Sequence, residues 1–328
     1  MNYQIIQHQH IFTPGQQAFR QCHASTICQL SNDEIAAAWF GGDHEKAPNV
    51  AIWFSKRKNG EWSTPAKIAD KENIPCWNPV LLALPDKLVL FYKVGREIMS
   101  WQTMVKESYD FGESWGDERE LVPGDFGGRG PVKNKCLILK DKTILAPASV
   151  EGRYWECFVD RSTDGGRTWE KSENVPLEKS ALKDRGVIQP SLWEDDQGIV
   201  HMFMRSSEGA IYSSDSADSG KSWSTARQTQ LPNNNCGLDL TRLEDGRLVL
   251  VYNPVSGNWA ARSPIAFSVS EDNGVTWSGP QILDHVPCEK NEERAEFSYP
   301  AVVSRGKDIF LTYTWKRQSI AFWQIRFF

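Results

Sequence analysis

The stretch STDGGRTW at residues 162–169 decides the fold of this chain, because the sequence repeats it. Clean copies begin at Ser108, Ser216 and Ser270, and a degraded copy without the aspartate begins at Ser55. Successive leading serines lie 53, 54, 54 and 54 residues apart. A period near 50 residues that is kept this closely is typical of a propeller or a solenoid.

The repeated octet has the composition of a tight turn. Its Ser and Asp side chains can accept hydrogen bonds from nearby backbone N–H groups, and its Gly permits a positive φ that other residues resist. The closing Trp offers a large ring to bury against a neighbouring unit. We favour this structural interpretation over calcium ligation or catalysis by the aspartates, because repeated turns cannot all line one site.

Each repeat also reads as about four short strands, of which the first two form a hairpin around a polar turn. Six such hairpins occur, at residues 25–40, 80–94, 136–149, 191–206, 240–254 and 301–315. No convincing helix or linker interrupts them. We therefore expect an all-β fold, a single six-bladed β-propeller domain over residues 1–328. The last blade lacks the Asp turn, and the stretch before Arg20 is expected to supply a strand that closes the ring.

Composition excludes several classes of function. The chain has 37 Lys and Arg against 42 Asp and Glu, so its formal net charge is −5, which argues against a nucleic-acid partner. No run approaches the roughly 18 apolar residues of a membrane helix, so no membrane partner is expected. The first residues lack the basic start and apolar stretch of a signal peptide, and the seven cysteines show no paired spacing. We expect a cytoplasmic protein with reduced thiols, and the oligomeric state stays open.

The repeat register predicts which residues share the face opposite the Asp turns. These are the residues leading into each inner strand and those between the second and third strands. The first group contains His23, Trp77, Asn78, Lys133, Lys135, Gln189, Asp239 and Tyr299, with Glu296 shortly before the last. The second group contains Asp43, His44, Glu45, Lys93, Arg205, Arg262, Tyr313, Trp315, Lys316 and Arg317.

This face is basic and aromatic in a chain whose net charge is negative. A concentrated positive charge indicates an anionic ligand, and aromatic rings such as Trp77, Trp259 and Trp315 are suited to stacking on a sugar. His23 and His44 both fall on this face in the first blade, and histidine exchanges protons near neutral pH. A zinc site at this pair would need a third ligand. We expect neither a metal nor a cofactor.

The Asp turns, known as Asp boxes, and the stretches CHASTICQL, AAAWFGG, CWNPVLL, VIQPSL and SYPAVV resemble the sialidase (neuraminidase) superfamily. The resemblance covers essentially the whole chain and is greatest to bacterial predicted neuraminidases with BNR repeats. Sialidases hold the substrate carboxylate with three arginines, attack with a Tyr–Glu pair and protonate with an Asp. The resemblance implies that Arg205 and Arg262 match the second and third arginines.

Other positions depart from the sialidase pattern. His23 starts the stretch in the register of the first arginine, and Phe297 stands where the nucleophilic Tyr is usual, with Tyr299 two residues on. The acid would lie near His44, between Asp43 and Glu45. Paired histidines resemble those of propeller ulvan lyases and related α-L-rhamnosidases, which act at uronic acids.

We therefore expect a sialidase-like exo-glycosidase that hydrolyses a bond at a terminal acidic sugar, either sialic or uronic acid, in an acidic oligosaccharide or glycoside. The expected acid is His44, Asp43 or Glu45, and His23 is a base or a further carboxylate contact. Candidates for the nucleophile or its activator are Tyr299, Tyr313, Glu296 and Asp239. The expected substrate-binding residues are Trp77, Asn78, Lys93, Lys133, Lys135, Gln189, Arg205, Arg262, Trp315 and Lys316. The alternatives are a uronate-directed lyase or α-L-rhamnosidase, and a glycan-binding propeller without catalytic activity.

Overall fold

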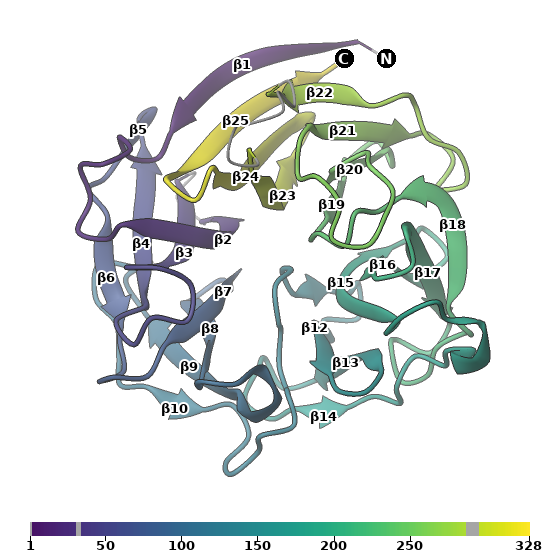
Figure 1. Ribbon diagram of the computed structural model, residues 1–328, viewed down its shortest axis with the longest axis horizontal. Coiled ribbons are helices and arrows are strands. Elements are labelled where there is room, and N and C mark those ends of the chain that lie inside the picture. Colours follow the sequence, from purple (N-terminus) through teal and green to yellow (C-terminus); the bar gives the residue numbers. More distant parts are fainter. Residues whose placement is uncertain (1, 31–33, 287–294) are drawn as a thin grey trace.

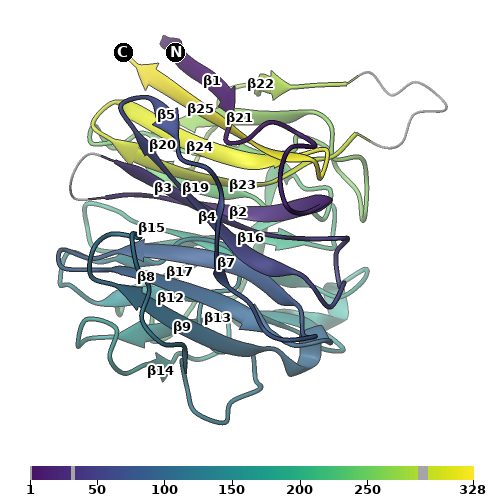
Figure 2. The same ribbon diagram turned by 90° about the vertical axis from the view of Figure 1, so that its left-hand side faces the viewer.

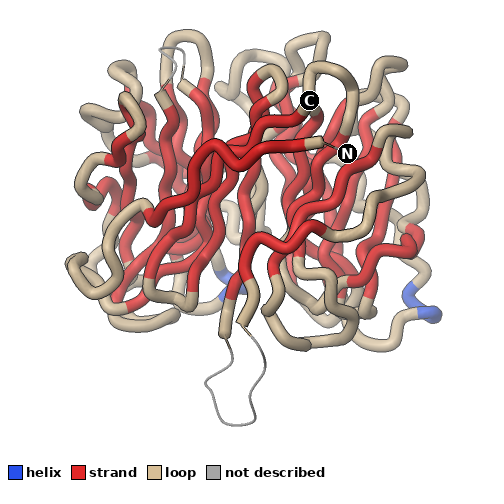
Figure 3. Tube along the Cα trace, turned by 90° about the horizontal axis from the view of Figure 1, so that it is seen from above, coloured by secondary structure: helices blue, strands red, loops and turns tan. Residues whose placement is uncertain are grey.

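In the computed structural model, which describes residues 2–30, 34–286 and 295–328, six antiparallel sheets surround a central axis (Figure 1). The all-β six-bladed propeller is therefore confirmed. The strands run between two faces of loops (Figure 3). Helix is limited to two 3-10 turns among the described residues, η1 (Ile98–Ser100) and η2 (Lys179–Ala181).

The blades use consecutive strands, from the axis outwards. Blade 1 contains β2 (Gln21–Gln29), β3 (Ile35–Gly42), β4 (Ala51–Lys58), β5 (Glu61–Trp62) and β6 (Ala66–Ala69). Blade 2 contains β7 (Cys76–Ala83), β8 (Leu88–Val94), β9 (Gln102–Ser108) and β10 (Arg119–Glu120). Blade 3 contains β11 (Leu137–Ile138), β12 (Ile144–Glu151), β13 (Trp155–Ser162) and β14 (Glu170–Lys171). Blade 4 contains β15 (Val187–Glu194), β16 (Val200–Ser206), β17 (Ala210–Ser216) and β18 (Arg227–Pro232). Blade 5 contains β19 (Asp239–Arg242), β20 (Leu248–Tyr252), β21 (Ile265–Ser270) and β22 (Gln281–Asp284). Blade 6 contains β23 (Phe297–Arg305), β24 (Asp308–Trp315), β25 (Ser319–Phe327) and, outermost, β1 (Tyr3–His10).

The N-terminal strand closes the ring, as expected from the sequence. β1 pairs antiparallel with β25, with Tyr3 opposite Phe327 and His10 opposite Ala321. The two chain ends meet there, since Phe328 N donates to Asn2 O (3.1 Å) (Figures 1 and 2). Blade 6 is therefore built from both ends of the chain.

The Asp turns have the hydrogen bonds expected from their sequence. In the copy at 162–169, Ser162 Oγ donates to Asp164 Oδ1 (2.8 Å) and accepts from Gly166 N (2.9 Å), and Thr168 N donates to Asp164 Oδ1 (3.0 Å). Gly166 has φ +87°, which a residue with a side chain would resist. The aspartate is thus committed to its own turn.

The Trp of an Asp turn packs on the preceding blade. Trp115 of blade 2 lies 5.6 Å from Phe54 of blade 1, between ring centroids, and Trp277 of blade 5 lies 5.8 Å from Phe203 of blade 4. Edge-to-face and tilted aromatic pairs at this spacing add to the gain from burial. The repeated tryptophans therefore hold neighbouring blades together.

A β-bulge recurs near the start of the inner strand in blades 1, 2, 4 and 6. The bulged residues Ala24, Asn78, Gln189 and Tyr299 have φ between +39° and +55°. In the last three the next residue is proline, which gives no N–H to the strand pairing. Bulges re-aim side chains, and here they bring Gln189 and Tyr299 into contact across the axis, with Gln189 Nε2 donating to Tyr299 Oη (3.3 Å).

The chain between β10 and β11 runs to the centre of the ring (Figure 1). There Lys133 Nζ donates to Asn134 Oδ1, to Leu238 O of the adjoining chain of blade 5 and to Pro300 O of blade 6. All three ammonium hydrogens therefore have acceptors. This segment takes the place of a long inner strand in blade 3 and fills the axis beneath the site face.

Asp239 connects four blades at a single carboxylate. Its oxygens accept from Lys135 Nζ beside blade 3 (2.9 and 3.0 Å), Ser191 Oγ of blade 4 (2.6 Å) and Val302 N of blade 6 (2.9 Å). The residue is 1% exposed. A buried carboxylate that satisfies a cation and a backbone N–H from different blades has a structural role.

The structure shows the state of six of the seven cysteines and whether any helix could span a membrane. Cys22, Cys28, Cys76, Cys136, Cys157 and Cys236 are all free and buried. Cys288 lies outside the described residues. Within residues 2–30, 34–286 and 295–328, none of the helices has the length and apolar character to cross a bilayer.

His201 on β16 is held between two carboxylates. Its Nδ1 lies 2.7 Å from Asp215 Oδ1 and its Nε2 lies 3.1 Å from Asp195 Oδ2. Burial disfavours the imidazolium, but the hydrogen bonds and charges of Asp215 and Asp195 outweigh burial and raise the pKa of His201 above 6.5. The charged form therefore joins the strand to its neighbour and to the hairpin turn.

Replacing His201 with Gln is expected to destabilise the protein more at about pH 5.5 than at about pH 9. A raised folded-state pKa adds stability that is complete below the unfolded value near 6.5 and is lost as pH rises through the folded value. Urea midpoints of wild type and His201→Gln at the two pH values measure this difference, with His285→Gln as the exposed control. An equal loss at both values would contradict a charged His201.

Candidate functional site

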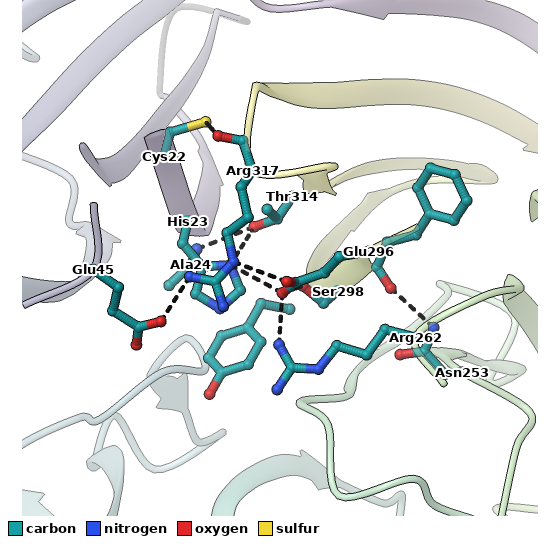
Figure 4. Close-up of polar contacts among 12 residues, drawn as sticks. Cys22, His23, Ala24, Glu45, Asn253, Arg262, Glu296, Ser298, Thr314 and Arg317 are labelled. Atoms are coloured by element: carbon teal, nitrogen blue, oxygen red, sulfur yellow. Dashed lines mark hydrogen bonds and ion pairs between the residues drawn. The ribbon is translucent and has the colours of Figure 1, made fainter. Parts of the chain in front are cut away.

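Seven side chains from four blades meet on the site face at the axis, and we call them the axial cluster. They are His23 on β2, Gln189 on β15, Arg205 on β16, Arg262 before β21, Glu296 and Tyr299 at β23, and Arg317 after β24. Figure 4 shows the part of the cluster around Glu296. The structure thus brings together residues that lie as far apart in the chain as His23 and Arg317.

Arg205 is the most buried guanidinium of the cluster, with 3% of its surface exposed. Its Nη1 donates to Tyr299 Oη (2.7 Å) and to Gln189 Oε1 (3.0 Å), and its Nε donates to Asn235 Oδ1 (2.8 Å). The planar group is therefore fixed by three partners. Its Nη2 has no hydrogen-bond acceptor among the described residues, which leaves two N–H groups for a ligand.

Aromatic rings surround the same guanidinium. Arg205 Cζ lies 5.5 Å from the ring centroid of Trp259, 5.8 Å from that of Trp155 and 5.7 Å from that of Tyr299. Trp259 is 56% exposed and has φ +54°, so the loop holds a large apolar ring towards solvent beside a cation. This arrangement suits a ligand that combines an anionic group with an apolar ring face.

Glu296 bridges the other two arginines. Its Oε1 accepts from Arg262 Nη1 (2.6 Å) and Ser298 Oγ (2.6 Å), and its Oε2 accepts from Arg317 Nε (2.9 Å). Burial would raise its pKa, but the charges of Arg317 and Arg262 outweigh burial and lower the pKa to about 2. Glu296 therefore stays ionised and positions both guanidinium groups (Figure 4).

His23 lies buried beside these cations. Its ring is 4.2 Å from the ring of Tyr299, and its Nδ1 is 2.9 Å from Thr314 Oγ1. Burial and the positive charges of Arg317, Arg262, Arg205 and Lys133 lower the pKa of His23 well below 6.5. The imidazole is therefore neutral at neutral pH and can accept a proton, but it is a poor contact for a carboxylate.

Arg317 belongs to the axial cluster, although the sequence gives it no role in binding or catalysis. The sequence places it on the basic face, and the resemblance identifies only Arg205 and Arg262 as carboxylate contacts. Its backbone O accepts from Cys22 N (2.9 Å), so its side chain enters the cluster beside the register where the resemblance expected the first arginine. The sequence does contain a signal for this placement: Arg317 lies just after the hairpin at residues 301–315, and Glu296 lies just before the same hairpin.

A cavity of about 830 Å³ adjoins the cluster between blades 1 and 6, and we call it the rim cavity. Asp43, His44, Trp315 and Lys316 line it together with Glu296 and Arg317. His44 and Asp43 are exposed, and His44 Nδ1 lies 2.8 Å from Glu45 O. Glu45 itself pairs with Arg317 Nη1 (2.7 Å). The expected acid residues of blade 1 therefore lie at the rim, beside the arginines.

Two predicted residues do not lie on the site face. Tyr313 is 0% exposed, and its Oη donates to Asp284 (2.6 Å) between blades 5 and 6. Side chains alternate along β24, so Tyr313 points to blade 5 whereas Thr314 points to His23. Trp77 is 2% exposed, and its ring packs 5.2 Å from that of Trp101. The placement of Tyr313 and Trp77 at a ligand surface is therefore wrong.

Three of the four predicted lysines and two further polar residues have their polar groups engaged inside the protein. Lys93 Nζ donates to Thr103 Oγ1, Arg129 O and Gly130 O, and burial lowers its pKa to about 7. Burial also lowers the pKa of Lys133, to about 8. Asn78 Nδ2 donates to Val132 O (2.9 Å), while Lys135 and Asp239 pair with each other. The expectation that these five residues bind a substrate is corrected, because the three ammonium groups, the Asp239 carboxylate and the Asn78 amide nitrogen already have protein partners.

The positive charge that stays open to a ligand at the axis is thus supplied by arginines, because the Lys133 ammonium is fully engaged by protein acceptors. An ammonium is a compact charge that three carbonyls can satisfy, whereas a guanidinium has five donors and keeps some free after it is positioned. Among the described residues, no group of three or more His, Cys, Asp and Glu side chains could hold a metal ion. The chemistry available on this face is anion binding, together with the acid–base groups His23, His44 and Asp43.

Comparisons with known proteins agree with this architecture. The family model described as a BNR repeat-like domain matches residues 33–311. A search of curated protein sequences found no match. Among solved structures, a Hadza microbial sialidase has a TM-score of 0.80 at 14% identity, covering 97% of this chain and 68% of that one.

Two further structures show the same fold at low identity. A protein of unknown function from Dyadobacter fermentans has a TM-score of 0.75 at 17% identity and covers 99% of both chains. The NanB sialidase from Streptococcus pneumoniae has a TM-score of 0.73 at 14% identity, covering 97% of this chain and 70% of that one. The chain therefore belongs to the BNR repeat-like domain family, and its six-bladed propeller is that of the sialidases.

Proposed function

We propose that this protein is a glycosidase that hydrolyses the bond between a terminal acidic sugar and its aglycone. One observation carries the proposal: three guanidinium groups from three blades meet at the axis. Arg205 and Arg262 lie at Tyr299, and Arg317 joins Arg262 through Glu296. In a chain whose net charge is −5, this concentration of positive charge favours an anionic ligand. Because the fold is sialidase-like, we take this anionic ligand to be the carboxylate of a sugar.

The three arginines would hold the sugar carboxylate. Arg262 and Arg317 are about one-fifth exposed, and Glu296 restricts their motion. Arg262 contacts Glu296 through Nη1, and Arg317 contacts Glu296 through Nε and Glu45 through Nη1. The Nη2 atoms of the two arginines have no acceptor among the described residues. Preorganised, charge-assisted donors bind a carboxylate strongly and specifically. In this role Glu296 is a positioning residue, because it acts through the arginines.

Tyr299 is the proposed nucleophile. Its Oη lies at the axis, held by Arg205 Nη1 and Gln189 Nε2. A guanidinium N–H at the phenol oxygen stabilises negative charge that develops on that oxygen. No carboxylate of a described residue bonds to Tyr299 Oη, so we assign the role of base to His23, whose neutral ring lies 4.2 Å from the phenol ring between centroids. Tyr299 Oη would attack the anomeric carbon while an oxocarbenium-like state develops.

A β-elimination lyase acting at uronate is a second candidate, because His23 is neutral and lies among arginines. Elimination needs a base for the C5 proton and a cation that neutralises the adjacent carboxylate. Here His23 would be the base and Arg205 or Arg262 the neutralising group. A glycan-binding protein without turnover is the third candidate. It would use the arginines and Trp259 alone.

A screen of aryl glycosides and oligosaccharides that end in sialic acid or in a uronic acid separates the three candidates. The proposal predicts release of the free acidic sugar by the wild type, with Tyr299→Phe reducing kcat by at least about 10²-fold. Ultraviolet absorbance of an unsaturated uronate would assign the lyase instead. Saturable binding in calorimetry with no product in either assay would assign the binding protein and overturn the proposed hydrolysis.

A further inference from the structure

A second, apolar cavity of about 240 Å³ lies on the site face near blades 2 and 3, and we call it the apolar cleft. Ile98, Met99 and Phe126 line it and are 38%, 64% and 57% exposed. Pockets for whole ligands span roughly 300–1,000 Å³, so the cleft is suited to one ring-sized part of a ligand. Exposed apolar side chains gathered around a hollow indicate binding of an apolar group.

The apolar cleft adjoins the axial cluster through two contacts. Ser149, which lines the cleft, accepts from Gln189 N through its Oγ (3.2 Å), and Gln189 Oε1 accepts from Arg205. Glu151 also lines the cleft and pairs across the β12–β13 hairpin with Trp155, whose ring lies 5.8 Å from the Arg205 guanidinium. A ligand anchored at Arg205 therefore has the cleft as its neighbour.

Glu151 is the acid at this boundary. Its side chain is partly buried, and no described residue forms a hydrogen bond or ion pair with its carboxyl. Burial raises its pKa, and the opposing charges of Arg205 and Arg185 do not restore the ordinary value. A carboxyl whose pKa is raised by burial beside an apolar pocket is better suited to act as a general acid than one held ionised by cations.

The acids expected from the sequence have different surroundings. Asp43 and His44 are exposed at the rim cavity, and Glu45 is paired with Arg317. Glu296 is ionised between two arginines. Glu151 differs from these groups in its position between the anion site and an apolar hollow, where burial raises its pKa.

We propose that the apolar cleft is the leaving-group subsite, that it takes an aryl or alkyl aglycone, and that Glu151 protonates the glycosidic oxygen. This inference rests on the proposed glycosidase function. As the glycosidic C–O bond breaks, the Glu151 proton passes to the oxygen and the aglycone departs as a phenol or alcohol. Tyr299 Oη meanwhile bonds to the anomeric carbon, and its phenolic proton passes to His23. Water then attacks that carbon and breaks its bond to Tyr299 Oη, leaving a hydroxyl on the sugar and giving its other proton to the Glu151 carboxylate. His23 returns its proton to the Tyr299 phenolate, so the cycle closes without a cofactor.

The test compares leaving groups on the acidic sugar that the wild type hydrolyses. A dinitrophenyl group leaves without protonation, whereas a phenyl or alkyl group needs it. Glu151→Gln is expected to reduce kcat/KM for the phenyl glycoside by about 10²–10⁴-fold and to leave the dinitrophenyl glycoside within about tenfold of wild type. Glu72→Gln, an exposed change away from the cleft, is the matched control and should alter neither rate.

A second variant tests the cleft itself. Phe126→Ala is expected to raise KM for the phenyl glycoside by roughly tenfold relative to the methyl glycoside, because it removes apolar contact area from the aglycone. Thermal melting of each variant shows whether it is folded.

Three results would overturn the inference. Equal effects of Glu151→Gln on both leaving groups would exclude a proton donor. The same leaving-group dependence in His44→Gln, with none in Glu151→Gln, would move the acid to the rim cavity. Both results leave the proposed glycosidase standing, whereas a wild type inactive on every acidic glycoside would refute the function and the inference together.

Discussion

Asp239→Asn is expected to lower the free energy of unfolding by about 3–5 kcal/mol, because breaking a buried ion pair by removing one charge leaves the other uncompensated. The amide keeps the shape of the side chain but cannot neutralise Lys135, and one of its two acceptor positions becomes a donor facing Lys135, Ser191 or Val302 N. Four blades lose a common contact at the axis. The urea midpoint measures the effect.

The same substitution distinguishes a structural aspartate from a nucleophile or its activator. If Asp239 is structural, Asp239→Asn protein that remains folded retains most of its specific activity, and only its stability falls. Asp86→Ala, in an exposed hairpin turn, is the control and should leave the midpoint unchanged. Loss of activity at an unchanged urea midpoint would show that Asp239 takes part in the chemistry.

Arg262→Ala is expected to reduce kcat/KM for an acidic glycoside by about 10²–10³-fold, which corresponds to about 3–4 kcal/mol. The substitution removes one carboxylate contact. It also leaves Glu296 with Arg317 as its remaining guanidinium partner, so a charged carboxylate then repels the substrate. Arg167→Ala, exposed in an Asp turn on the opposite face, is the matched control and should retain full activity.

A double variant separates the two parts of this effect. Adding Glu296→Gln to Arg262→Ala removes the repulsion and is expected to restore activity about tenfold, although the lost contact remains lost. Kinetics of the two single variants and the double variant give the coupling between the residues. Independent effects of the two changes would contradict a shared site.

The fold followed from the sequence because its signal is repeated. The Asp turns at Ser108, Ser162, Ser216 and Ser270 fix the period, and each is a local hydrogen-bond pattern that needs no distant partner. Ring closure also followed, since an unpaired outer edge of the last blade requires a strand and only the N-terminal stretch was left to supply one. Local chemistry and one global constraint were therefore sufficient for the architecture.

The site was predictable in place but not in detail. Register put Arg205, Arg262 and Tyr299 on one face, and they do meet there. Register does not tell whether a side chain near the axis points to solvent or has its hydrogen-bonding groups paired with other parts of the protein. Lys93 and Lys133 lie in suitable positions, yet carbonyls from other segments take up their hydrogens. Those acceptors belong to chain far away in sequence, so the lysines could not be recognised as structural in advance.

Glu151 and Arg317 show a related limit. Arg317 lies on the face that the sequence identifies and Glu151 is the last residue of β12, but neither matches a residue to which the sialidase resemblance gives a role. Their properties come from neighbours: Glu296 and Glu45 for Arg317, and burial beside the apolar cleft for Glu151. Environment, and not residue type, makes them candidates.

The central claim is that the axial arginines recognise a sugar carboxylate. The most direct measurement compares kcat/KM for a methylumbelliferyl glycoside of the acidic sugar with that for its carboxyl methyl ester, which has the same shape near the bond and no charge. The account predicts that wild type prefers the free acid by at least about 10²-fold and that Arg262→Ala reduces this preference to about tenfold or less. Equal rates on acid and ester by the wild type would contradict it.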